Sequence, residues 1–111
     1  MSPFAVELTG QGYLRVTSEV AAACFPGDLL VASVRGREMW LLPLRGPGAG
    51  GLLLKRRNAR GDRSVLLTEV IPPDVAPGVY PAIWDDREAA LRVALTAGQA
   101  ADPAPTGGAP A

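Results

Sequence analysis

Short runs in which every second residue is apolar, separated by glycine-containing turns, constrain this chain more than any other feature of its sequence. In Phe4–Thr9, Val6 and Leu8 share one face of an extended chain. Tyr13–Thr17 repeats the alternation, and Gly10-Gln11-Gly12 lies between the two runs. Alternation with a period of two is typical of half-buried strands, and a glycine turn lets the chain fold back on itself. We therefore predict that these two runs form a β-hairpin.

The next stretch predicts a short helix followed by a second hairpin. Ser18 is a favourable N-cap residue, so we expect it to cap a helix over residues 18–24. Proline and glycine in Phe25–Asp28 end that helix. Leu29–Val34 and Met39–Leu42 are rich in strand formers and are joined by a glycine-containing turn.

Residues 50–70 combine strand formers with concentrated positive charge. Leu52–Lys55 and Ser64–Ile71 are predicted strands, and the residues between them include the turn formers Asn58 and Gly61. The predicted hairpin places five cations against one carboxylate, Asp62: Lys55, Arg56, Arg57, Arg60 and Arg63. One interpretation is a solvated loop whose arginines bond loop carbonyls and nearby carboxylates. The other is a docking patch for an acidic protein or a phosphate, since arginine recognises both with two parallel hydrogen bonds.

The C-terminal part leaves one assignment open. Tyr80–Trp84 is an extended segment, but residues 86–97 fit either a helix capped by Asp85 or a turn followed by a strand over Ala90–Leu95. We favour the strand, because apolar residues alternate there and the preceding segments are all strands. Residues 98–111 are rich in Ala, Pro and Gly and contain no large apolar side chain, so we expect a disordered tail.

The fold class predicted from these elements is mainly β. We expect a single domain over residues 1–97, built as a small barrel or sandwich of about seven or eight short strands in hairpins, with one short helix over residues 18–24. Gly-rich residues 45–51 lack the Gly-Lys-Ser/Thr ending of a phosphate-binding loop, so we interpret them as a connection between hairpins.

Composition excludes several classes of function. The chain has no histidine and a single cysteine, Cys24, which removes the commonest general base, an internal disulfide and any cysteine-rich metal site. The neighbours Asp85 and Asp86 would point to opposite faces of a strand, which does not suit an acid–base pair. We therefore predict no catalytic, cofactor-binding or metal-ligating residue, and no enzyme.

The charge and the hydropathy of the chain set expectations about location. Formal net charge is zero, whereas generic nucleic-acid and membrane-surface binders are usually basic. The N-terminus has no charged-then-apolar signal pattern, and no apolar run is long enough to span a membrane. We expect a cytoplasmic protein with no membrane contact, and the abundance of Ala, Gly, Pro and Arg is typical of GC-rich bacteria.

Residues 12–44, GYLRVTSEVAAACFPGDLLVASVRGREMWLLPL, resemble the swapped-hairpin family of AbrB and MraZ transcription factors. The shared pattern is strand, short helix, Gly-Asp turn, strand, turn and a strand ending near proline. The resemblance implies a homodimer that binds DNA through basic residues of its first strands. Arg15 is the cation that these strands offer here, so DNA binding is the alternative rather than the first expectation.

The second half, GGLLLKRRNARGDRSVLLTEV with YPAIWDDREAALRVAL, is similar to small accessory proteins associated with maturation of [NiFe] hydrogenases. That similarity implies a non-catalytic maturation factor that binds a larger redox enzyme during assembly. The expected contact is the basic hairpin, with Trp40 and Trp84 as apolar anchors.

Overall fold

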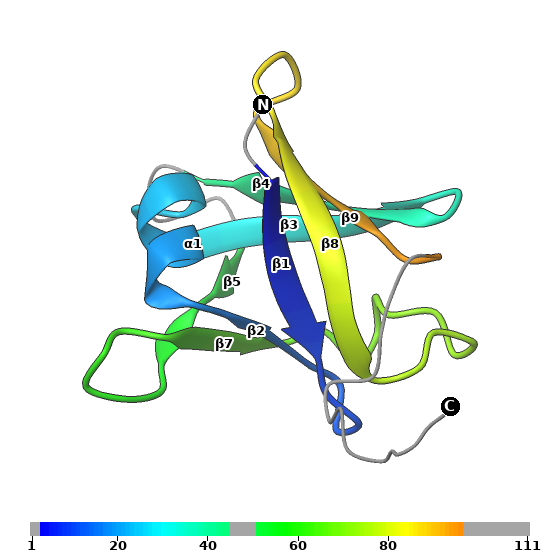
Figure 1. Cartoon of the computed structure of the whole chain (residues 1–111), viewed down its shortest axis with the longest axis horizontal. Coiled ribbons are helices and arrows are strands. Elements are labelled where there is room, and N and C mark those ends of the chain that lie inside the picture. The colour runs from blue at the N-terminus through cyan, green and yellow to red at the C-terminus, as the bar shows by residue number, and fades with distance from the viewer. Residues whose placement is uncertain (1–2, 45–50, 97–111) are drawn as a thin grey trace.

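The computed structural model describes residues 3–44 and 51–96, which form one antiparallel sheet of nine strands and one short helix (Figure 1). The helix α1 covers Ser18–Cys24. The strands are β1 Pro3–Leu8, β2 Tyr13–Val16, β3 Leu29–Arg35, β4 Glu38–Pro43, β5 Leu52–Leu53, β6 Lys55–Arg56, β7 Arg63–Leu66, β8 Gly78–Asp85 and β9 Ala90–Ala94. The predicted mainly β class with one short helix is confirmed. Residues 45–50 of the predicted connection over residues 45–51, and the whole predicted tail over residues 98–111, lie outside the described residues.

The sheet curls into a nearly closed barrel. Its strand order is β5-β3-β4-β9-β8-β1-β2-β7-β6, so its two end strands are neighbours in the chain. Leu54 alone separates β5 from β6, and its N–H donates to the carbonyl of Asp28 at 2.8 Å. The chain therefore stops pairing with β3 and begins pairing with β7 within one residue, so Leu54 connects the two end strands of the sheet.

Alternation along the strands builds the core. Val6 and Leu8 of β1, and Tyr80 and Ala82 of β8, point inward, while the residues between them are exposed or half-buried. Among the described residues, Phe25 and Tyr80 are the only aromatic members of the buried core, so aliphatic packing dominates, as the low aromatic content requires. In the part of the chain that the structure describes, no polar or charged residue is buried as a whole, so the charged side chains there are at least partly exposed.

The helix has the predicted span, but its N-cap lies one residue earlier than predicted. Thr17, not Ser18, is the N-cap, and its side-chain oxygen accepts the N–H of Val20 at 3.3 Å. β2 accordingly ends at Val16, because Thr17 turns out of the strand to start the helix. One face of α1 packs into the barrel through Val20, Ala21 and Cys24.

The predicted hairpin over residues 52–71 is wrong in its strand boundaries. The first predicted strand splits into β5, which pairs with β3, and β6, which pairs with β7. The second ends at Leu66, because the N–H groups of Val70 and Ile71 both return to the carbonyl of Leu67 in a turn. The favoured strand after Trp84 is confirmed as β9, and the helical alternative is wrong.

Candidate functional site

The loop between β6 and β7 is held in shape mainly by Asn58 and Asp62. The Asn58 Nδ2 donates to Asp62 Oδ2 at 3.0 Å, and the Asp62 N–H donates to Asn58 Oδ1 at 3.2 Å. The Arg57 N–H donates to the Asp62 carbonyl at 2.7 Å. Gly61 has φ +93°, a conformation that residues with a Cβ rarely adopt. The loop backbone is therefore organised before any partner arrives.

Asp62 also fixes this loop against the start of α1. Its Oδ1 accepts the backbone N–H of Ser18 at 2.9 Å, across 44 residues of sequence. The hydrogen bonds from Asn58 and Ser18, helped by the nearby Arg60 cation, lower the pKa of the Asp62 carboxyl. The one carboxylate of the loop is thus a structural acceptor that stays ionised.

Two of the five predicted contact cations serve the fold of the loop. The Arg56 guanidinium donates to the carbonyls of Asn58 and Ala59 at 3.0 and 2.9 Å. Arg63 forms an ion pair with Asp28 at 3.0 Å and also donates to the carbonyl of Gly61. Both guanidinium groups are therefore fixed in position, as the solvated-loop interpretation expects.

The other three cations, one on β6 and two in the loop, are exposed. Arg60 is 82 % exposed and lies 3.5 Å from Asp62. Within the part of the chain that the structure describes, the side chains of Lys55 and Arg57 make no hydrogen bond or ion pair. These three cations are available to a binding partner.

A shallow hollow of about 470 Å³ lies between this loop and α1. It is lined by Ser18, Ala21, Ala22, Pro26, Arg56, Arg60, Gly61 and Arg63. Three arginines therefore border small apolar side chains of the helix and of the turn after it. Because guanidinium groups bond carboxylates and phosphates through paired donors, the hollow suits an acidic group on a compact segment.

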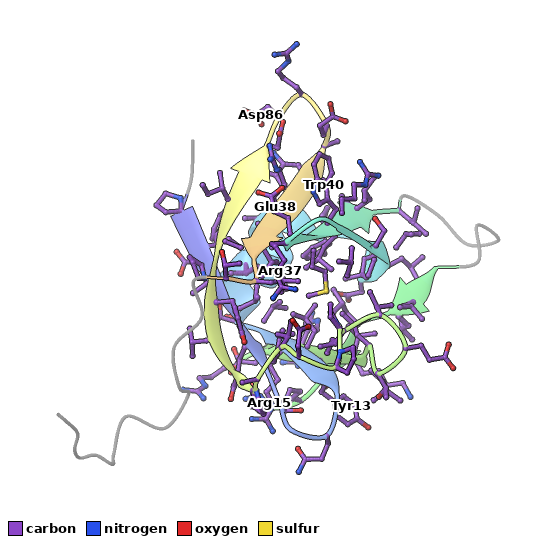
Figure 2. All side chains as sticks on the ribbon, turned by 90° about the vertical axis from the view of Figure 1, so that its right-hand side faces the viewer. Tyr13, Arg15, Arg37, Glu38, Trp40 and Asp86 are labelled. Carbon is purple, nitrogen blue, oxygen red and sulfur yellow. The ribbon has the colours of Figure 1, made fainter. Side chains whose placement is uncertain are left out.

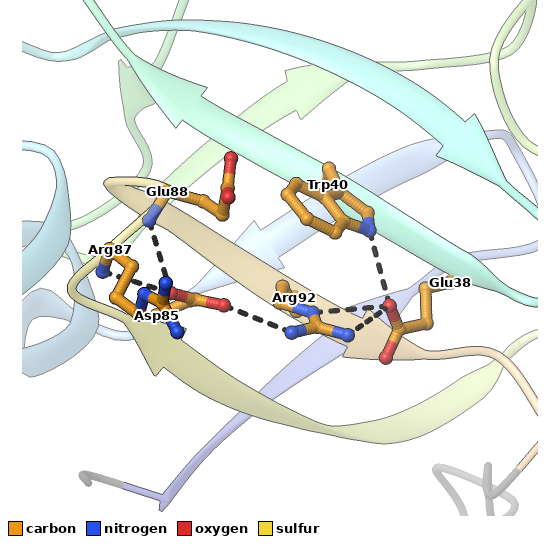
Figure 3. Close-up of polar contacts among 6 residues, drawn as sticks. All are labelled: Glu38, Trp40, Asp85, Arg87, Glu88 and Arg92. Carbon is orange, nitrogen blue, oxygen red and sulfur yellow. Dashed lines mark hydrogen bonds and ion pairs between the residues drawn. The ribbon is translucent and has the colours of Figure 1, made fainter.

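Trp40 lies elsewhere, on the outer face of β4, where two arginines stack on it. The Arg35 and Arg92 guanidinium carbons lie 4.2 and 4.8 Å from the centre of its ring, within range of cation–π attraction. Its indole N–H donates to Glu38 Oε1 at 3.1 Å, and the same oxygen accepts two hydrogen bonds from Arg92 (Figure 3). Trp40 belongs to a fixed network of charged groups.

The predicted pair Asp85 and Asp86 is used by the turn between β8 and β9. Asp85 Oδ1 accepts the N–H groups of Arg87 and Glu88 at 2.9 and 3.1 Å, and its Oδ2 accepts from Arg92 (Figure 3). The Glu88 N–H bond and the Arg92 bond lower the pKa of Asp85. Asp86 accepts the indole N–H of Trp84 at 2.8 Å. The two carboxylates therefore have separate hydrogen-bond partners.

The structure does not bring the two tryptophans to the loop between β6 and β7, which we call the basic loop. β1 and β2 lie between β8 and β7 in the sheet, and the β8–β9 turn and the β6–β7 loop project from different sides of the barrel (Figure 1). Arg92 lies on the outer face of β9, and its partners could not be identified from the sequence. Glu38 precedes it by 54 residues, and only the pairing of β4 with β9 joins them.

Cys24 and the acidic side chains are the remaining residues with potential chemistry in the described regions. Burial raises the pKa of the Cys24 thiol to about 11, so this cysteine is a core residue rather than a nucleophile. Among residues 3–44 and 51–96, no three acidic or thiol side chains are grouped so that they could hold a metal ion.

Comparison of the chain with protein-family models, curated proteins and solved structures gives no match. In the described residues, no helix has the length and apolar character needed to cross a membrane.

Proposed function

We propose that this chain is a non-catalytic accessory protein that binds an acidic surface of a larger protein through the loop between β6 and β7. The observation that supports the proposal best is the hollow beside α1, where Arg56, Arg60 and Arg63 surround a small apolar floor. Two of these arginines are already fixed by hydrogen bonds, so little side-chain freedom is lost when a partner binds.

The charge distribution favours a protein partner over nucleic acid. The chain has no net charge, and three of its exposed cations, Lys55, Arg57 and Arg60, lie on β6 and in the loop that follows it. On the first strands, Arg15 lies 3.7 Å from Glu7, so its charge is partly neutralised. A duplex would require several phosphate contacts along an extended surface, whereas a local acidic patch on a protein requires only this loop.

The similarity to hydrogenase-associated accessory proteins gives a first partner class to test, a redox enzyme under assembly. A dimeric DNA-binding regulator of the AbrB/MraZ type is the alternative. No contact in the described residues favours it, and the experiment below separates the two.

The test is affinity capture from the native cell with nuclease present, followed by titration of the purified partner. The loop variant carries Lys55→Glu, Arg57→Glu and Arg60→Glu, the three cations that do not hold the loop together. A matched control carries Arg15→Glu, Arg37→Glu and Arg87→Glu, which changes net charge equally but leaves the loop intact.

We expect the wild type and the control to bind one stoichiometric protein, and the loop variant to lose it. In titrations the dissociation constant should rise at least about tenfold for the loop variant and should increase with salt. Equal loss in both variants would show a response to net charge only and would overturn the assignment of the loop. Recovery of DNA without a protein partner would favour the regulator.

A further inference from the structure

A second hollow, of about 530 Å³, lies on the outer face of β4, β9 and β8, away from the basic loop. It is lined by Glu38, Pro81, Ile83, Trp84, Asp85, Asp86, Arg87, Arg92 and Ala94. The volume falls within the range of about 300–1,000 Å³ that is usual for small-ligand sites. Its floor is apolar, since Pro81, Ile83 and Ala94 alternate outward on paired strands. Figure 2 shows Glu38, Trp40 and Asp86 in the same part of the molecule, far from Tyr13 and Arg15.

Arg92 gives this hollow its chemical character, and it does not make an anion site. Its Nε and Nη2 donate to Glu38 Oε1 at 3.1 and 2.9 Å, and its Nη1 donates to Asp85 Oδ2 at 2.9 Å. An incoming anion would have to displace two carboxylates that already hold the guanidinium. The side chain is 37 % exposed, so part of its planar group remains accessible.

The Arg92 guanidinium lies against Trp40 and Arg92 also lines the hollow. Its central carbon lies over the Trp40 ring, 4.8 Å from the ring centre. A guanidinium plane stacks well on aromatic rings. An aromatic ring placed in the hollow would therefore contact Ile83 and Pro81 while it stacks on Arg92.

The remaining charge favours a cation in the occupant. The lining holds three carboxylates, Glu38, Asp85 and Asp86, against two cations, Arg87 and Arg92. Among the described residues, Glu38 uses only Oε1 in hydrogen bonds and Asp86 only Oδ1. An acceptor oxygen on each therefore remains for a positively charged group.

We propose that this hollow binds a partner segment that carries an aromatic side chain next to a cationic one. The ring packs on the apolar floor and stacks on Arg92, and the cation pairs with Glu38 or Asp86. The site is separate from the basic loop, so this proposal does not depend on the function proposed above.

The two tryptophans of the chain provide a direct readout, because Trp84 lines the hollow and Trp40 lies against Arg92. The probe is the capped dipeptide acetyl-Trp-Arg-amide, titrated into ¹⁵N-labelled protein while the two indole N–H signals are followed by NMR. Acetyl-Trp-Glu-amide and acetyl-Ala-Arg-amide are the comparison probes. We expect saturable shifts of both indole signals with Trp-Arg, and at least about tenfold weaker responses with the other two.

Matched aspartate substitutions test the position of the site. Ile83→Asp places a charge on the floor of the hollow, and Val31→Asp places one on β3, outside it; the two side chains are similarly exposed, at 43 % and 41 %. Ile83→Asp should weaken Trp-Arg binding at least about tenfold, whereas Val31→Asp should leave it unchanged.

Glu38→Gln tests the charge argument, because it keeps an acceptor for Trp40 while removing the net negative charge of the lining. The preference for Trp-Arg over Trp-Glu should shrink in this variant. Absence of indole shifts up to the solubility limit of Trp-Arg would overturn the proposal. Equal binding of Trp-Arg and Trp-Glu to the wild type, or binding unaffected by Ile83→Asp, would overturn it too.

Discussion

The Oδ1 of Asp62 accepts the backbone N–H of Ser18 at 2.9 Å and so joins the basic loop to the first turn of α1. The two residues are 44 positions apart, and neither is basic. Ser18 and Arg60 both line the hollow between loop and helix, so this bond joins the two elements that form the hollow. Asp62 also pairs with Arg60, whereas Arg63 is held by Asp28.

Asp62→Ala should therefore release the loop from the helix. Amide exchange of Ser18 should become several-fold faster, because its acceptor is lost. Capture of the partner should weaken although the variant has one more net positive charge. Asp74→Ala is the matched control, since it removes a carboxylate from the exposed pair with Arg37 and leaves the loop intact. If both variants bind the partner more tightly than the wild type, charge matters more than loop geometry.

The pH dependence of stability should contain a contribution from Asp62 and Asp85. Both carboxyl groups have a lowered pKa in the folded protein, the first through Asn58 and Ser18 and the second through Glu88 and Arg92. The folded state therefore binds fewer protons than the unfolded state, where the pKa is about 3.9. This stabilisation is fully present above about pH 4 and is lost as the pH falls through the lower folded values.

Thermal unfolding between pH 2 and pH 7 measures that contribution. The double variant Asp62→Asn, Asp85→Asn keeps the shape of both side chains but cannot titrate at either position. Its Tm should fall less than that of the wild type between pH 4 and pH 2. Parallel curves for the two proteins would contradict the assignment of these two carboxylates.

Much of the fold could be predicted from local patterns. The hairpins of β1 with β2 and of β3 with β4 follow from alternation and short turns, because their partners are adjacent in the chain. The split at Leu54 could not be predicted. Leu52–Lys55 has the pattern of one strand, and only closure of the barrel sends its two halves to β3 and β7.

The candidate sites were also predictable only where they depend on local sequence. The charge of the basic loop is visible in the sequence, but the use of Arg56 and Arg63 as internal ties depends on loop geometry. The network of Glu38, Arg92 and Asp85 depends on three strands meeting in the sheet. Local pattern identifies which residues face outward, whereas long-range strand pairing decides which of them meet.

The start of α1 offers a direct comparison of two neighbouring candidates for its cap. Thr17→Ala should cost about 1 kcal/mol of unfolding free energy, because the N–H of Val20 loses its side-chain acceptor. Ser18→Ala should change it by less than about 0.5 kcal/mol, since Ser18 lies within the helix and its backbone N–H bond is unaffected. Urea unfolding of the two variants decides between them, and a larger cost for Ser18→Ala would place the cap where the sequence suggested it.

Leu54 is the residue at which the barrel closes, and its neighbour Leu53 provides an internal control. The Leu54 side chain is 2 % exposed and that of Leu53 is 53 % exposed, although both lie in the same leucine run. Leu54→Ala should cost about 2–5 kcal/mol of unfolding free energy, through lost burial and the cavity left between β5 and β6. Leu53→Ala should cost less than about 0.5 kcal/mol in the same urea titration. Similar costs for the two variants would mean that the barrel does not close through Leu54.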